Sequence, residues 1–63
     1  MKKGYSIFLT GLGDLYNVQD FMPQGIENFF STEGMAEYYL SYGDMELDKS
    51  GRIFVILPTY KES

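Results

Sequence analysis

Cysteine, histidine and tryptophan are all missing from this chain of 63 residues. Without cysteine the chain has no disulfide bond and no thiolate nucleophile, and without histidine it has no side chain whose unperturbed pKa lies near neutrality. Cysteine and histidine are also the usual ligands of structural zinc. We therefore expect a protein that is not an enzyme, with no catalytic residues, no cofactor and no metal site.

Positive charge is scarce too. Nine acidic residues against five basic ones give a net charge of −4, and the basic residues are dispersed along the chain. This balance argues against direct binding to nucleic acid, whose phosphates require a basic surface. No apolar run approaches the roughly 20 residues that cross a bilayer, and no cleavage site follows the first apolar run. We therefore expect a cytoplasmic protein with no membrane partner.

The short chain and its apolar patterns predict one small α+β domain that spans residues 1–63. Residues 5–12 alternate in the manner of a strand and end in a glycine-rich turn. A candidate N-cap at Asn17 and apolar residues at helical spacing after Pro23 predict a helical segment over residues 17–33.

The segment over residues 35–43 fits two structures, because its tyrosines match the spacing of a helix and of a strand equally well. Gly34 would be a natural C-cap for the preceding helical segment, and tyrosine favours extended structure. These two features favour a strand from about Ala36 onward. The helical alternative stays open.

A hairpin is predicted around Asp48-Lys49-Ser50-Gly51, which has the residues of a type I turn followed by a glycine bulge. Its register would place Leu47 opposite Ile53 and Met45 opposite Val55, on a face that the helical segment covers. The predicted fold is therefore a small three-stranded, mainly antiparallel sheet in the order strand, helix, strand, strand (β-α-β-β), with one helical layer.

One helical layer covers only one face of such a sheet. Residues 53–57 are apolar without a break, which predicts burial on both faces and a central position in the sheet. Phe8, Phe54 and Ile56 are predicted to share the second face and to bury it by self-association, which makes a homodimer. On this interpretation Phe54→Asp abolishes self-association, whereas Val55→Asp unfolds the domain.

Six tyrosines and five phenylalanines suggest that the surface binds a protein. Tyr38, Tyr39 and Tyr42 are of the type that is enriched at protein interfaces, and one of the first two must point outward in a helix or a strand. Asp44 and Glu46 form an acidic row, whose spacing does not match a calcium loop. We predict that these five residues contact the partner.

Taken together, these patterns predict a non-enzymatic protein-binding module. We expect a small homodimeric regulator or inhibitor of a larger protein, of the kind found among viral and mobile-element accessory proteins. Two alternatives stay open. One is an acidic mimic of nucleic acid that blocks a DNA- or RNA-handling protein. The other is a structural subunit of a larger assembly.

Overall fold

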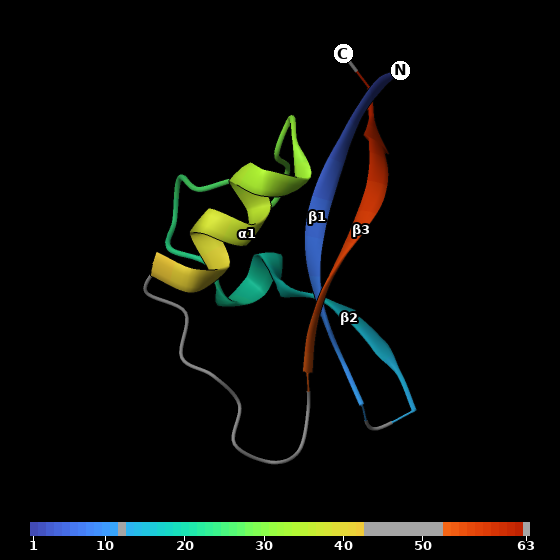
Figure 1. Cartoon of the computed structure of the whole chain (residues 1–63), viewed down its shortest axis with the longest axis vertical. Coiled ribbons are helices and arrows are strands. Elements are labelled where there is room, and N and C mark those ends of the chain that lie inside the picture. Colours follow the sequence, from blue (N-terminus) through green and yellow to red (C-terminus); the bar gives the residue numbers. More distant parts are fainter. Residues whose placement is uncertain (12, 43–52, 63) are drawn as a thin grey trace.

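A computed structural model describes residues 1–11, 13–42 and 53–62 of the chain (Figure 1). Within these ranges the protein is a small α+β fold in which an antiparallel sheet has the strand order β2-β1-β3. The helical elements α1 and η1 lie on the same side of the sheet (Figure 1). The elements, in chain order, are β1 (Lys2–Thr10), β2 (Leu15–Asn17), the 3₁₀ helix η1 (Val18–Phe21), α1 (Glu33–Tyr42) and β3 (Ile53–Lys61).

The predicted α+β class, the three-stranded antiparallel sheet and the single α-helix agree with these elements. The predicted β-α-β-β order is not confirmed, because the described elements run β-β-α-β. The third strand of the sheet is β2, which follows β1 through a turn in which Gly11 and Gly13 have positive φ angles of 118° and 87°. The hairpin predicted around residues 48–51 lies outside the described residues.

The long helical segment predicted over residues 17–33 is wrong. Asn17 does cap a helix, because its side chain accepts a hydrogen bond from the Gln19 N–H, but that helix is the short η1. Met22 is extended, as residues before proline tend to be, and Pro23 begins a tight turn. Gly25 has a φ of 93° in that turn, which the Ile26 N–H closes by donating to the Pro23 carbonyl. Proline and glycine together therefore stop the helix after one turn.

The α-helix lies where the residues favoured a strand. Thr32 is its N-terminal cap: its hydroxyl accepts from the Met35 N–H at 3.2 Å, and its carbonyl accepts from the Ala36 N–H at 3.3 Å. Gly34 is thus inside α1 rather than at the end of an earlier helix. The helix buries Ala36 and packs Tyr39 and Leu40 against the core, at the i, i+3 and i+4 spacing of one helical face.

The core lies between α1, η1 and the sheet. Ile7 and Leu9 of β1 are buried beside Val18, Met22 and Ala36. Several partly buried apolar residues pack around this cluster, namely Tyr5, Phe30, Tyr39, Leu40, Phe54 and Ile56.

The register of β3 on β1 corrects the predicted faces of the sheet. Leu9 lies directly opposite Phe54 and Ile7 opposite Ile56, and residues that lie opposite one another in antiparallel strands share a face. Phe54 and Ile56 therefore face the core. Val55, which was predicted to face the core, lies on the other side. The prediction derived the face of Val55 from pairing with the segment around Met45. In the structure β3 pairs with β1, and the register of that pairing determines which of its side chains face the core.

β1 is the central strand, and both of its edges are occupied. β3 pairs with its full length, and β2 pairs with its last three residues. Beyond β2, the Asn28 side chain takes the place of a strand, because its Oδ1 accepts from the Ile7 N–H and its Nδ2 donates to the Ile7 carbonyl, both at 2.9 Å. Phe30 then exchanges two backbone hydrogen bonds with Tyr5, at 2.7 and 2.8 Å.

Within the described residues β3 lies at the edge of the sheet, although its apolar run predicted a central strand. The strand also continues through Pro58. Tyr5, opposite Pro58, directs its backbone N–H and carbonyl toward Phe30. The backbone position of Pro58 therefore points away from β1, and the missing N–H costs the sheet no hydrogen bond.

Candidate functional site

The side of the sheet opposite α1 carries a set of apolar side chains that we call the open face. Its members follow from the register, which places Phe8 opposite Val55 and Thr10 opposite both Ile53 and Leu15. The open face consists of Phe8, Leu15, Ile53, Val55 and Leu57.

The open face is accessible to solvent over much of its area. Ile53 is 58% exposed and Leu15 is 55% exposed, while Phe8, Val55 and Leu57 are half-buried. None of the five side chains carries a charge. Both helical elements lie on the other side of the sheet (Figure 1).

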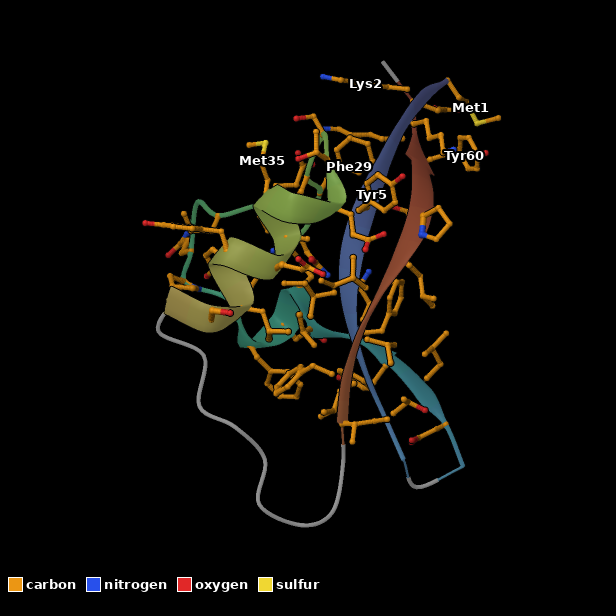
Figure 2. All side chains as sticks on the ribbon, viewed as in Figure 1. Met1, Lys2, Tyr5, Phe29, Met35 and Tyr60 are labelled. Atoms are coloured by element: carbon orange, nitrogen blue, oxygen red, sulfur yellow. The ribbon has the colours of Figure 1, made fainter. Side chains whose placement is uncertain are left out.

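Phe29 closes the open face at the first half of β1, beside which it lies in Figure 2. Its ring occupies the space that a side chain at position 4 would need, and Gly4 leaves that space free. The Lys61 Nζ lies 5.7 Å from the ring centroid and 2.6 Å from a carboxylate oxygen of Glu27. Next to this cluster the Ser6 and Thr59 hydroxyls lie 2.7 Å apart. The open face therefore has a polar boundary at this end.

The outer edge of β3 is the second feature of the site, and we call it the open edge. Tyr5 and Ile7 turn their backbone groups away from β3, so the backbone groups of their partners Pro58 and Ile56 point outward. Because the direction of the backbone groups alternates from residue to residue along a strand, those of Phe54 and Tyr60 point outward as well. Among the described residues, none pairs with this edge.

The predicted self-association residues do not form one surface. Phe8 belongs to the open face, whereas Phe54 and Ile56 pack against the core on the opposite side. The residues that join Phe8 on the open face include Val55 and Leu57. An apolar second face thus exists, but its members differ from those predicted because β3 pairs with β1 in a register that residues 53–57 alone do not reveal.

The predicted partner-binding tyrosines Tyr38 and Tyr39 differ in their exposure to solvent. Tyr38 is 67% exposed, while Tyr39 is half-buried and places its ring 5.6 Å from the Phe30 ring. The prediction that one of these two neighbours points outward is confirmed. Tyr42 ends α1, and Asp44 and Glu46 lie outside the described residues. The role of these five residues in binding a partner stays a prediction.

Sequence patterns alone missed a second exposed aromatic group. The Tyr16 and Phe21 rings lie 5.5 Å apart, and both side chains are exposed. The Tyr16 hydroxyl donates to the Asp20 carboxylate at 3.2 Å. The i, i+4 spacing of Tyr16 and Asp20 was the available signal, because η1 brings such residues close together.

Residues 1–11, 13–42 and 53–62 contain no group of three or more histidine, cysteine, aspartate or glutamate side chains arranged to hold a metal ion. They also contain no helix that is long and apolar enough to span a membrane.

Comparisons with known proteins identify no relative from which a function could be inferred. No family model, no curated protein and no solved structure matches the chain. The open face and the open edge are therefore interpreted through the physical chemistry of their own residues.

Proposed function

We propose that this chain is a non-enzymatic protein-binding module, a homodimeric regulator or inhibitor of a larger protein, and that the open face contacts that protein. The observation that carries the proposal is the exposure of Leu15 and Ile53 in a cluster of five apolar side chains on one face of the sheet. Contiguous apolar surface of this kind marks sites of protein interaction.

Burial of the open face by a partner would be favourable by a modest free energy. Full burial of a leucine or isoleucine side chain is worth about 1.5–3 kcal/mol, so burial of the exposed halves of Leu15 and Ile53 contributes about 2 kcal/mol together. Phe8, Val55 and Leu57 add the remainder of their accessible surface. A partner that covers all five side chains gains more than any single exposed residue offers elsewhere on the chain.

The net charge of −4 indicates the character of the larger protein. An acidic module associates faster with a basic surface than with an acidic one, and the dependence on salt concentration reports this steering. We therefore propose a partner with an apolar patch surrounded by basic residues.

The experiment is a capture from an extract of the cells that express the chain, with three immobilised baits. Wild-type chain and a Met35→Lys variant should retain the same protein, and a Leu15→Lys variant should lose it. Met35 is the matched control, since it is 54% exposed, close to the 55% of Leu15, and lies on α1 away from the open face. The captured protein is then purified, and its affinity for each bait is measured by titration calorimetry. Equal affinity for the Leu15→Lys variant and the wild type would overturn the proposal.

A further inference from the structure

We infer that two copies of this chain associate through the open edge, with β3 pairing antiparallel to β3 of the second copy in a register centred on Val55. The inference rests on the homodimer proposed above and specifies the part of the molecule that forms it. The open face of each copy then stays available to the larger protein.

The first half of β3 lacks the features that normally protect a sheet edge. Natural edge strands carry proline, lysine or inward-pointing charges, which prevent pairing with another chain. Pro58 and Lys61 provide this protection in the second half of β3. Residues 53–57 contain neither, and the outward N–H and carbonyl groups of Phe54 and Ile56 pair with no described residue.

Pro58 also excludes one of the neighbouring registers. With the two-fold axis at Val55, Phe54 lies opposite Ile56 of the second copy, and each of these outward N–H groups meets an outward carbonyl. A register centred on Ile56 would instead place Phe54 opposite Pro58, which has no N–H to donate. The register centred on Val55 therefore satisfies every outward donor and acceptor of Phe54 and Ile56.

The side chains of the paired strands are compatible as well. In this register Val55 lies opposite Val55, and Ile53 lies opposite Leu57 of the second copy. All of these belong to the open face, and apolar cross-strand pairs of this type stabilise a sheet. The two open faces would then join into one continuous apolar surface, twice as wide as that of a single copy.

Charge favours a second copy over a charged partner strand at this edge. From Ile53 to Tyr60, β3 carries no lysine, arginine, aspartate or glutamate, so two copies bring no like charges together along the paired segment. A charged partner strand would lose its hydration there without meeting an opposite charge. Because both copies carry a net charge of −4, added salt should strengthen the dimer by screening their longer-range repulsion.

The first test needs no substitution. Solution mass is measured by light scattering across a dilution series, and amide hydrogen exchange is measured by NMR at concentrations where the monomer or the dimer dominates. The Phe54 and Ile56 amides should exchange rapidly in the monomer and at least about tenfold more slowly in the dimer. The Tyr60 amide is an internal control. It also points outward but lies beyond the paired segment, so its exchange should not change.

The second test uses chemical synthesis, which is practical for a chain of 63 residues. N-methylation of the Ile56 amide removes one outward donor, keeps the side chain and leaves the hydrogen bonds between β3 and β1 intact. It should weaken the dimer by at least about tenfold, since a symmetric dimer loses two hydrogen bonds. N-methylation of the Tyr60 amide is the matched control and should change the dissociation constant less than about twofold. Circular dichroism verifies that both synthetic chains fold.

The outcomes separate this inference from the proposed function. A dimer in which Phe54 and Ile56 exchange as fast as in the monomer would overturn the edge pairing and leave the homodimer standing. A monomer at all concentrations, or assembly beyond a dimer, would overturn the edge pairing and the homodimer together. Neither result bears on binding of the larger protein, which the Leu15→Lys bait tests independently because Leu15 lies on β2, outside the paired segment of β3.

Discussion

Replacement of Gly4 by alanine should destabilise the fold although it adds only one methyl group. A Cβ atom at this position would lie 2.5 Å from Cζ of Phe29 and 2.6 Å from the carbonyl oxygen of Phe30. The two contacts differ in how readily they relax. The Phe29 ring is the end of a side chain and can move aside. The Phe30 carbonyl is backbone, and it accepts the Tyr5 N–H at 2.7 Å.

The magnitude follows from these contacts. The φ angle of Gly4 is not among the positive ones, so alanine adds no backbone strain and the cost is steric. Insertion of a methyl group into a packed site typically costs about 1–3 kcal/mol, and weakening of the Tyr5–Phe30 bridge adds about 1 kcal/mol. We therefore expect Gly4→Ala to lower the free energy of unfolding by about 2–4 kcal/mol. For a domain of this size the melting temperature would fall by roughly 10–30 °C.

The assay is urea unfolding followed by circular dichroism, with Gly34→Ala as the matched control. Gly34 lies in α1, and a Cβ atom there would meet nothing within 4 Å. The same substitution should therefore raise stability, by up to about 1 kcal/mol, because alanine has the higher helix propensity. If Gly4→Ala is as stable as the wild type, or if the two variants shift stability in the same direction, the close approach of residues 29–30 to β1 is not as described.

Three further predictions concern the core and the two faces of the sheet. Asn28→Asp keeps the shape of a buried side chain but replaces its NH₂ donor with an oxygen, so the free energy of unfolding from urea titration should fall by about 2–4 kcal/mol; an unchanged midpoint would contradict the strand-like role of this side chain. Phe54→Asp should unfold the domain, since the residue packs against the core, whereas Val55→Asp should leave the circular dichroism spectrum unchanged; the opposite pattern would show that the register is wrong. Tyr39→Ala should cost about 2 kcal/mol in thermal unfolding and Tyr38→Ala less than about 1 kcal/mol, and equal losses would be inconsistent with their unequal burial.

The two long strands could be predicted from local sequence patterns, whereas the position of the α-helix could not. Alternation in residues 5–12 and the apolar run at 53–57 both predicted strands; β1 includes residues 5–10 of the first segment, and β3 includes all of the second. The helix was misplaced because Gly34 resembled a C-cap, although Thr32 just before it had the residue type of an N-cap. Competing local signals of about 1 kcal/mol each do not decide such a segment, and packing of one face of α1 on the core does.

The candidate site, like the fold, could be predicted from the sequence only in part. One tyrosine of the pair Tyr38 and Tyr39 had to point outward, and that follows from backbone geometry alone. Which side of β3 meets the core does not follow, because a strand with apolar residues at every position fits either face equally well. Phe54 and Val55 exchange their expected environments for this reason.

The absence of histidine and cysteine, the acidic net charge and the positions of the two long strands were determined by the amino-acid sequence itself. These depend on composition and on neighbours within a few residues. The central place of β1, the position of β3 at the edge of the described sheet and the residues of the open face were decided by the tertiary structure. They depend on pairing between β1 and β3, which lie at opposite ends of the chain, and on an Asn28 side chain that occupies the remaining edge of β1. Long-range hydrogen bonding sets the register, and the register determines which side chains reach the surface.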